Sequence, residues 1–462
     1  PYTTLFRSKI AVVGAGPAGL SCAFFLAQDG YKVTVFEKQQ KLGGMLTFGI
    51  PAFRLEKNVI DAEIDVLREM GVEFKTGFEV GKDASISDLR NEGYEGFYIA
   101  IGAQAGRSIG IDGEDAGGVF TGVDFLRQVN LGEKPDIRGK VLVIGGGNVA
   151  IDVARTAVRS GGETVTMFCL EKRAEMPALP EEIEEAVHEG IVIENSWGPK
   201  RVIVKDGRVA GMEFKKCTAV FDASGRFSPS YDEGETIMVE ADRIILSIGQ
   251  AMDWGKLLEV TKVELNPNKT IKADPVTFQT AEPDIFAGGD AMTGPKFAID
   301  AIAMGKEGAI SLHRFVHKGQ SLTLGRLKRD YKALDKEDLD LESYDRIPRQ
   351  RPLDTAAKHA VDFSDTRGIF TAEQVQKETE RCLSCGASVI DEFMCVGCGQ
   401  CVTRCKFEAI KLVRRYDEAG VPFEKLKPKV VQYMIKRKLR IAGKNILAKL
   451  ASPFSAKKDK AE

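Results

Sequence analysis

The chain has 462 residues, which corresponds to about three domains at ~150 residues each. It contains 65 Lys and Arg against 67 Asp and Glu, and a net charge of −2 excludes the strongly basic character of a general nucleic-acid binder. The sequence has neither the ~18-residue apolar run of a membrane span nor a secretion signal near residue 1. We therefore expect a soluble, cytoplasmic protein without a transmembrane segment.

The first eight residues, PYTTLFRS, match the translation of a common sequencing adapter. We interpret residues 1–8 as an artefact outside the fold, and we expect the natural chain to extend upstream. The first predicted strand begins at Lys9.

Residues 9–37 predict one βαβ unit built from a strand, a glycine-rich turn, a helix and a second strand. In the G-x-G-x-x-G turn, Gly14 makes the tight bend, Gly16 lets a pyrophosphate approach the backbone, and Gly19 packs the helix on the strand. The helix then starts with free N–H groups that bind phosphates. Glu37 ends the second strand, where a carboxylate accepts hydrogen bonds from an adenosine ribose.

Residues 140–173 repeat this unit, with Gly145, Gly147 and Ala150 at the three turn positions. Two such turns predict two dinucleotide cofactors on one chain. The alternative is that one turn is a relic that binds nothing, but both turns keep the glycine at the phosphate-approach position.

The end of the second unit predicts which nicotinamide cofactor binds. Glu171 follows the last strand, and a carboxylate at this position repels a ribose 2′-phosphate, which favours NAD(H) over NADP(H). Lys172 and Arg173 come directly after it and are able to contact such a phosphate instead.

Three later segments are predicted to lie near a ligand. FYIAIGAQAG (97–106) and DRIILSIGQ (242–250) read as buried strands that end in glycine, which suits a chain crossing between two domains. In residues 283–315 a strand leads to Gly288, Gly289 and Asp290, ahead of a helix rich in small residues. Small residues allow the start of a helix to lie against a flat ligand.

These motifs resemble a known family. GAGPAG, KLGGMLTFGIPAFRLEK, GGGNVAID, KRAEMPA, SIGQ and FAGGDAMTGP make residues 9 to about 318 similar to the two-dinucleotide-binding flavoprotein reductases, above all to the small-subunit family of bacterial glutamate synthase. The resemblance implies that the first turn binds FAD, that GGMLTFGIP lines the flavin and that Asp290 hydrogen-bonds the ribityl chain. It also implies a nicotinamide cofactor at the second turn.

One departure from the family bears on that cofactor. Many members have two arginines a few residues before the EMP motif, and this chain has Leu170 and Glu171 there. The family's usual preference for NADPH is therefore not expected.

The predicted sites hold cofactors, and no acid, base or nucleophile of the chain is required, because flavin and nicotinamide carry out hydride transfer themselves. The predicted cofactor-binding residues are Gly14, Gly16, Pro17, Ala18, Gly19, Glu37, Lys38, Gly43, Gly44, Met45, Gly49, Ile50, Pro51, Gly102, Gly145, Gly147, Asn148, Val149, Ala150, Glu171, Lys172, Arg173, Gly249, Gly289, Asp290, Lys296, Phe297 and Ala298.

Six cysteines near the C-terminus predict at least one 4Fe-4S cluster. They are Cys382, Cys385, Cys395, Cys398, Cys401 and Cys405, and the last four reproduce the C-x2-C-x2-C-x3-C run of bacterial ferredoxins. In two-cluster ferredoxins the fourth cysteine binds the other cluster, but six thiolates are two short of two complete clusters. A structural zinc site formed by the first four cysteines is the alternative, and it would leave the last two without a metal.

A basic segment ends the chain, with twelve Lys and Arg against one Asp and one Glu from Lys425 onward. A basic amphipathic helix of this kind meets a membrane surface, nucleic acid or an acidic redox partner. We prefer a solvated helix whose narrow apolar stripe packs on protein. Its members are Val430, Val431, Met434 and Ile435.

We therefore predict an α/β protein with two Rossmann-like dinucleotide-binding domains and a small C-terminal iron–sulfur segment. The expected divisions are 9–110 with 251–318 (discontinuous FAD-binding domain), 111–250 (NAD(P)-binding domain), 319–370 (charged linker, loosely packed), 371–415 (4Fe-4S ferredoxin-like segment, opened by a capping box at Thr371) and 416–462 (basic tail).

The predicted function is that of an electron-transfer enzyme. Electrons would pass from NAD(P)H through FAD to a 4Fe-4S cluster and then to a redox partner, such as ferredoxin or a larger oxidoreductase subunit. One alternative is an electron-supply subunit in a hetero-oligomeric complex like glutamate synthase. Another is a redox-sensing module without turnover. No nucleic-acid partner is expected.

Overall fold

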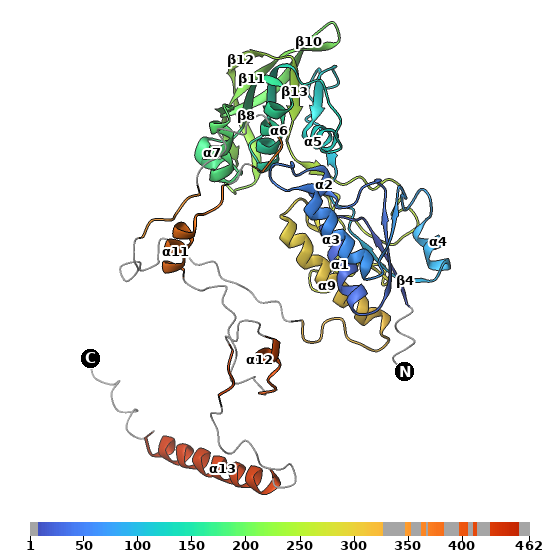
Figure 1. Cartoon of the computed structure of the whole chain (residues 1–462), viewed down its shortest axis with the longest axis vertical. Helices are drawn as coiled ribbons and strands as arrows, with labels where there is room; N and C mark the ends of the chain where they lie inside the picture. Colours follow the sequence, from blue (N-terminus) through green and yellow to red (C-terminus); the bar gives the residue numbers. More distant parts are fainter. Residues whose placement is uncertain are drawn as a thin grey trace, which may run out of the picture. The chain divides into compact units, whose positions relative to one another are not determined.

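The computed structural model describes residues 8–326, 347–352, 362–365, 368–382, 397–404, 410–413 and 426–451. Internal contacts divide the chain into two units, residues 1–381 and 382–462. Two α/β bodies make up most of the first unit, and Figure 1 shows each as a group of strands covered by helices.

The first α/β body is built on a five-stranded parallel sheet. Its strand order is β15 (Ile285–Ala287), β4 (Tyr94–Ile99), β1 (Lys9–Val13), β2 (Lys32–Glu37), β3 (Glu73–Thr76). One hydrophobic cluster joins the sheet to α1 (Pro17–Gln28), α3 (Lys57–Glu69) and α9 (Ala298–Val316). A second cluster joins it to α4 (Ile86–Asn91), so the body has three layers. The sheet is discontinuous in sequence, because β15 follows the whole second body.

The second α/β body contains another five-stranded parallel sheet. Its order is β6 (Val119–Thr121), β13 (Arg243–Leu246), β7 (Gly139–Ile144), β8 (Gly162–Cys169), β9 (Val192–Asn195). One hydrophobic cluster joins it to α5 (Gly122–Asn130), α6 (Asn148–Arg159) and α7 (Pro180–His188).

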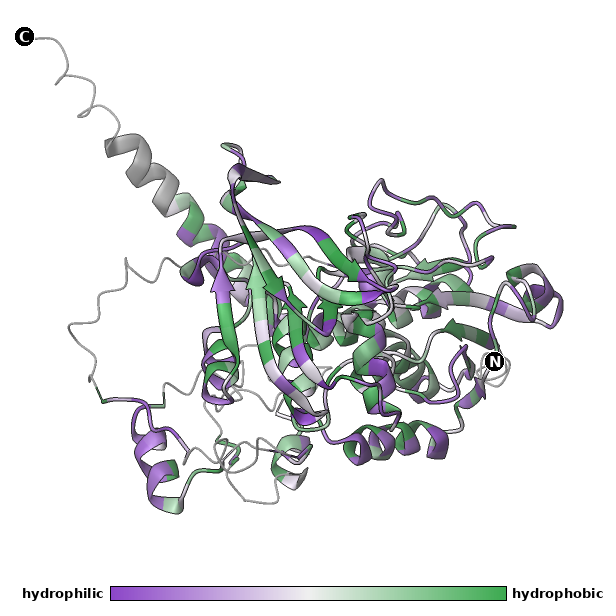
Figure 2. Ribbon diagram, turned by 90° about the horizontal axis from the view of Figure 1, so that it is seen from above, coloured by the Kyte–Doolittle hydropathy of each residue, from purple (hydrophilic) through white to green (hydrophobic). Residues whose placement is uncertain are grey.

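An antiparallel sheet covers part of this second body. Its strands are β10 (Trp197–Lys205), β11 (Arg208–Phe221) and β12 (Phe227–Glu240). Phe168 of β8 stacks on Phe214 of β11 with ring centroids 4.0 Å apart, inside a further hydrophobic cluster. In Figure 2 hydrophobic residues lie mainly on the inner strands and hydrophilic residues on the outer helix surfaces.

The two bodies are connected by two crossing segments that pair with each other. β5 (Ala105–Gly106) and β14 (Gln250–Ala251) form a short antiparallel ladder. These segments include the glycine-ended strands that the sequence predicts as crossings close to a ligand.

Several short elements complete the described chain. They are α2 (Met45–Phe48), the 3₁₀ turn η2 (Arg173–Glu175), α8 (Asp290–Thr293), α11 (Ala372–Glu380), α12 (Gln400–Arg404) and α13 (Leu426–Ala451). The capping box predicted at the start of α11 is confirmed: Thr371 and Gln374 each bind the other's backbone N–H.

The predicted fold class is confirmed, because both parallel sheets and their crossover helices are present. Ser8 belongs to the ordered chain, since its carbonyl accepts a hydrogen bond from the N–H of Lys32. Within the predicted linker, the carbonyl of Asp362 accepts a hydrogen bond from Arg159, and Phe363 lies 6.5 Å from Phe53 between ring centroids. This part of the linker therefore contacts both bodies, at Arg159 in the second and at Phe53 in the first. The sequence-based domain boundaries stay predictions.

The basic tail forms the helix α13 over its described part. Val430, Val431, Met434 and Ile435 are each about half exposed, so their packing on protein stays a prediction. In the described ranges, none of the helices combines the length and apolar composition needed to cross a membrane.

Candidate functional site

The first glycine-rich turn contains two glycines that the chain's own packing requires. Gly14 has φ +105°, and a Cβ on it would lie 2.4 Å from the carbonyl oxygen of Ala100. A Cβ on Gly19 would lie 2.0 Å from the carbonyl oxygen of Gly14, at the contact between helix and strand. Both positions exclude any side chain.

Gly16, the middle glycine, differs because its own surroundings do not demand glycine. Its φ of −79° and ψ of 178° suit any residue, and a Cβ there would meet nothing closer than the Cα of Gly44, at 3.9 Å. It caps α1 without a side-chain hydrogen bond, so the first N–H groups of the helix are available to an anion. A methyl group would fill the space that a pyrophosphate needs, which fits the predicted dinucleotide.

Glu37 ends β2, at the position predicted to contact an adenosine ribose. Its carboxylate is buried and accepts hydrogen bonds from the N–H of Ala15 and the N–H of Gln39, both at 2.9 Å. Burial raises the pKa of Glu37, while these backbone contacts oppose the rise. A cavity of about 50 Å³ is lined by Gly14, Glu37 and Lys38, which matches their predicted neighbourhood.

The segment predicted to line a flavin forms a cradle beside the first turn. A Cβ on Gly44, whose φ is +55°, would lie 2.7 Å from the Cα of Gly16, so the two backbones touch. Lys57 donates to the carbonyls of Leu46 and Ile50, which holds the short helix α2 and the residues after it. Burial lowers the pKa of Lys57 to about 8.

Asp290 comes from the third glycine-rich segment and lines a cavity together with Gly44 of the cradle. Gly289 before it has φ +65°, and Oδ1 of Asp290 accepts a hydrogen bond from the N–H of Lys296 at 3.2 Å. Burial raises the pKa of Asp290. The close crossing of α9 over α1 sets this position, because a Cβ on Gly305 would lie 2.3 Å from the carbonyl oxygen of Ala18.

One cavity of about 190 Å³ brings together half of the predicted contacts. Its predicted members are Gly16, Pro17, Ala18, Gly44, Met45, Gly49, Ile50, Gly102, Val149, Gly289, Asp290, Lys296, Phe297 and Ala298. Sequence reasoning missed several others, above all Gln104, Leu126, Asp152 and Gln250. The Oε1 atom of Gln104 is buried and, within the described residues, lacks a hydrogen-bond partner. An orphaned acceptor on this wall fits a polar ligand.

The second glycine-rich turn repeats the geometry of the first. Gly145 has φ +142°, and a Cβ on it would lie 2.4 Å from the carbonyl oxygen of Ser247. Gly147 has φ −92°, and its nearest neighbour would be Pro177 at 4.0 Å. Ala150 is fully buried at the helix–strand contact. Again the middle glycine leaves space that the chain itself does not fill.

A cavity of about 530 Å³ opens beside this turn and is lined by Gly145, Gly147, Glu171 and Gly249. Glu171 is half-buried, and its Oε2 atom lies over Gly146, where a Cβ would be 2.7 Å away. No sequence motif indicated the aromatic part of this wall. Its members are Trp197, Phe227 and Tyr231, which come from the antiparallel sheet.

Five further predicted contacts are not among the residues that line these cavities: Gly43, Pro51, Asn148, Lys172 and Arg173. The Oδ1 atom of Asn148 accepts a hydrogen bond from the N–H of Leu179, and Lys172 lies 3.9 Å from Glu175. Arg173 opens the exposed turn η2. A Cβ on Gly43 would lie 2.2 Å from Oγ1 of Thr47, so Gly43 is required by packing.

The C-terminal cysteines are only partly described. Cys382, Cys398 and Cys401 are exposed, free thiols, and Gly397 and Gly399 have positive φ, as a tight loop requires. Cys385, Cys395 and Cys405 lie outside the described residues. Within the described ranges no cluster of metal-ligating side chains is assembled, and the cluster ligands stay a prediction.

Comparison with protein-family models gives two matches. Residues 8–305, more than half of the chain, match the model described as pyridine nucleotide-disulphide oxidoreductase. Residues 388–411 match the model described as 4Fe-4S binding domain.

Similar curated proteins include three oxidoreductase subunits. The NADP(+)-dependent formate dehydrogenase subunit beta of Moorella thermoacetica is 36% identical over 82% of this chain and 54% of its own length. The NADPH-Fe(3+) oxidoreductase subunit beta of Geobacter sulfurreducens is 32% identical over 82% of this chain and 61% of its own length. The glutamate synthase [NADPH] small chain of Escherichia coli is 36% identical, covering 65% of this chain and 67% of its own. The chain thus spans little more than half the length of the first two.

Solved structures share the fold of the first unit. Mycobacterium tuberculosis FprA in complex with NADPH has a TM-score of 0.58 and 18% identity, covering 67% of this chain and 85% of its own. Thioredoxin reductase of T. acidophilum has a TM-score of 0.52 and 19% identity, covering 66% of this chain and 98% of its own.

Proposed function

The chain belongs to the pyridine nucleotide-disulphide oxidoreductase family, and from this we propose that it passes electrons from NAD(P)H through FAD to a 4Fe-4S cluster and a partner protein. One observation carries the proposal. The cavity lined by Gly16, Gly44 and Asp290 is also lined by Val149 and Asp152, from the first two turns of α6. The helix that begins at the second glycine-rich turn therefore borders the flavin cradle. We propose that a nicotinamide held at that turn would meet a flavin in this cavity.

The role proposed for the chain's own residues is to bind and orient the cofactors. Gly16 and the free N–H groups of α1 would hold the pyrophosphate of a bound FAD, Glu37 would accept hydrogen bonds from its ribose, and Asp290 would accept one from its ribityl chain. A bound flavin supplies the redox chemistry, because it takes up a hydride and releases electrons singly. We assign no catalytic acid, base or nucleophile to the protein.

The isolated thiols of the first unit do not support disulfide chemistry. Disulfide exchange needs two neighbouring thiols and a thiolate. Cys22, Cys169 and Cys217 are free and buried, and burial raises the pKa of each. They are poor nucleophiles, so electrons are proposed to leave through the C-terminal cysteines.

For the nicotinamide cofactor we propose NAD(H). The carboxylate of Glu171 lines the cavity of the second turn, where it would repel a 2′-phosphate. Of the cations that follow, Lys172 lies near Glu175. The three curated relatives carry NADP or NADPH in their names, so this chain would differ from them in coenzyme.

The six C-terminal cysteines are proposed to hold at least one 4Fe-4S cluster. Residues 388–411, which match a 4Fe-4S binding domain, include four of them, and Cys398 and Cys401 are exposed there. Exposed thiols are accessible to a metal cluster and to a partner protein.

The absorption spectrum and metal content of anaerobically purified protein test this function directly. We expect flavin absorption, iron and sulfide in a 4Fe-4S ratio, and bleaching of the flavin band by NADH. Steady NADH-dependent reduction of a viologen should follow. Protein with zinc instead of iron would overturn the electron-exit route, and a flavin that stays oxidised under excess NADH and NADPH would overturn the entry route.

A second candidate is an electron-supply subunit of a larger complex. The curated relatives are named as subunits or a small chain, which favours it. In that case purified protein would reduce a viologen but would lack a substrate reaction of its own. Co-purification of the native protein with a second oxidoreductase polypeptide would support this form.

A further inference from the structure

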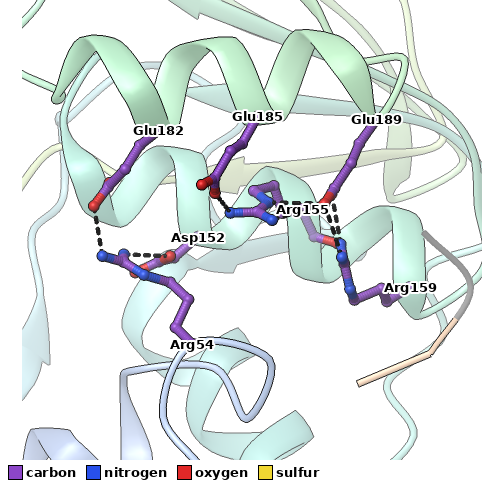
Figure 3. Close-up of polar contacts among 7 residues, drawn as sticks. All are labelled: Arg54, Asp152, Arg155, Arg159, Glu182, Glu185 and Glu189. Carbon is purple, nitrogen blue, oxygen red and sulfur yellow. Dashed lines mark hydrogen bonds and ion pairs between the residues drawn. The ribbon is translucent and has the colours of Figure 1, made fainter. Parts of the chain in front are cut away.

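Arg54 connects the two α/β bodies at a point next to the flavin cradle. It lies in the loop between α2 and α3, four residues after Ile50. Its Nη1 donates to both carboxylate oxygens of Asp152, at 2.7 and 2.8 Å, and its Nη2 donates to Glu182. Figure 3 shows Arg54 reaching from the loop to carboxylates on two helices, α6 and α7. One guanidinium thus binds two elements of the second body.

These carboxylates depend on Arg54 because they are largely buried. The side chains of Asp152 and Glu182 are 9% and 11% exposed. The Oε2 atom of Glu182 is buried and, within the described residues, has no hydrogen-bond partner. Removing one partner of a buried ion pair leaves a desolvated charge behind, which is costly. Loss of Arg54 is therefore expected to separate the loop from the two helices.

The second body has other cations that hold α6 and α7 to each other. Arg155 of α6 donates to Glu185 and Glu189, and Arg159 donates to Glu189. Figure 3 shows this chain of pairs beside the Arg54 pairs. The contact between α6 and α7 therefore does not need Arg54, whose distinct role is to bind both helices to the first body.

A neighbouring residue strengthens the same attachment. Phe53 is buried, with the guanidinium groups of Arg155 and Arg159 at 4.7 and 4.1 Å from its ring centroid. On the opposite side of the cradle, Asn130 of α5 donates to the carbonyl of Phe48 at 3.0 Å. The cradle and the second body thus make direct contacts in addition to the crossing segments.

The position of α6 matters because of what the helix carries. It begins at the second glycine-rich turn, and Val149 and Asp152 line the flavin cavity. The two crossing segments pair with each other in a two-residue ladder, β5 with β14. Such a connection leaves rotation between bodies available unless side chains restrain it.

We propose that Arg54 is a positioning residue. Its ion pairs with Asp152 and Glu182 hold α6 against the flavin cradle, so that the nicotinamide-binding turn at the start of α6 has the geometry needed for electron transfer. This inference rests on the proposed function. Arg54 binds neither cofactor in this proposal. Its effect is therefore on the rate of transfer and not on the affinity for either cofactor.

Arg54→Gln tests the proposal, with Arg90→Gln as the matched control. Arg90 also binds two carboxylates, Asp284 at 2.7 Å and Glu282 at 2.8 Å, and the side chains of Arg54 and Arg90 are 31% and 29% exposed. All three residues of the control lie within the first body. Loss of a two-carboxylate pair is thus common to both variants, and loss of the connection between bodies is specific to Arg54→Gln.

We expect Arg54→Gln to keep its FAD and its Kd for NADH, while flavin reduction in a single turnover slows at least about tenfold. Hydrogen exchange of residues 51–56 and 148–155 should become faster. Arg90→Gln should change neither measurement. Arg54→Lys, which keeps a charge but not the two-pronged geometry, should lie between wild type and Arg54→Gln.

Wild-type reduction rates and exchange in Arg54→Gln would overturn the proposal, as would equal losses in Arg90→Gln. If Arg54→Gln does not fold, Arg54→Lys decides by the same two measurements. The difference in hydrogen exchange between Arg54→Gln and Arg90→Gln is measured without electron transfer. A wild-type protein whose flavin neither NADH nor NADPH reduces would therefore refute the proposed function alone.

Discussion

The two glycine-rich turns begin alike and end differently. In the first, Glu37 is 3% exposed and is fixed by the N–H groups of Ala15 and Gln39, beside cavities of about 50 and 190 Å³. In the second, Glu171 is half-buried and faces a cavity of about 530 Å³. A fixed carboxylate in a narrow site suits a cofactor that stays bound. An open site suits a nucleotide that must leave after each turnover.

The largest expected effect is on flavin retention in Gly16→Ala. The backbone at Gly16 tolerates alanine, and the new methyl carbon would lie in ordinary van der Waals contact with the protein, 3.9 Å from the Cα of Gly44. It would instead occupy the space of the pyrophosphate. We expect a folded protein that purifies almost without flavin, measured by absorbance and circular dichroism. A Gly16→Ala protein with a full complement of FAD would show that the first turn is not the flavin site.

The matched substitution at the second turn is Gly147→Ala. Its methyl group would also be accommodated by the chain, with Pro177 at 4.0 Å. We expect full FAD content but NADH binding weakened by about a hundredfold, or ~2.7 kcal/mol. Titration of the flavin-containing protein with NADH measures this. Loss of FAD from Gly147→Ala, with NADH binding intact, would reverse the assignment of the two turns.

A smaller effect is expected on coenzyme choice in Glu171→Arg. Replacing the carboxylate with a guanidinium removes repulsion of a 2′-phosphate and adds a phosphate ligand. The ratio of kcat/KM for NADPH to that for NADH should rise about tenfold, or ~1.4 kcal/mol.

Glu163→Arg is the control for this change, because it alters net charge equally from an exposed position near the start of β8, at the opposite end of the strand from Glu171. Its coenzyme ratio should move less than that of Glu171→Arg. An unchanged ratio in Glu171→Arg would refute the role of Glu171 in coenzyme choice.

The turns were predictable because their chemistry is local. Gly14, Gly16 and Gly19 lie within six residues. Backbone conformation or packing requires Gly14 and Gly19, whereas Gly16 leaves space for a ligand, and the spacing of the motif alone indicates these roles. Glu37 was predictable for the same reason, since it ends the strand that follows the helix. Fold class followed from two such units with strands before and after them.

Residues that reach the cavity only because the two bodies pack together could not be predicted from the sequence. Asp152 and Leu126 line the flavin cavity from α6 and α5, and their position depends on how the second body packs against the cradle. Sequence spacing holds no information on that packing. Gln104 follows a buried strand that is predicted to end near a ligand, which is a usable signal, but the glycine pattern at this strand end indicates only Gly102. The aromatic wall of the second cavity depends on β10–β12, whose pairing is long-range.

The smallest expected effect concerns the stability contributed by Asp152, which belongs to the second body but lines the cavity of the first. Burial raises its pKa to about 6, whereas an unfolded aspartate titrates near 3.9. The charged groups around it are Arg54, Lys57, Arg155 and Glu182. Between pH 7 and pH 5 the folded chain therefore takes up a proton that the unfolded chain does not. This contribution to the free energy of unfolding is fully present below about pH 4 and is lost as the pH rises through 6.

Urea unfolding of wild type and Asp152→Asn at pH 5 and pH 7 measures this contribution. Wild type should gain about 1 kcal/mol relative to Asp152→Asn at the lower pH. Glu189→Gln is the control. Burial raises the pKa of Glu189, but hydrogen bonds from Arg159 and Arg155 outweigh burial and lower it. The contribution of Glu189 to the free energy of unfolding is therefore lost only below pH 5. The difference between wild type and Glu189→Gln should therefore be the same at both pH values. An equal difference between wild type and Asp152→Asn at the two pH values would mean that Asp152 stays ionised at pH 5. The positive charge of Arg54 would then stabilise the Asp152 carboxylate more than burial destabilises it.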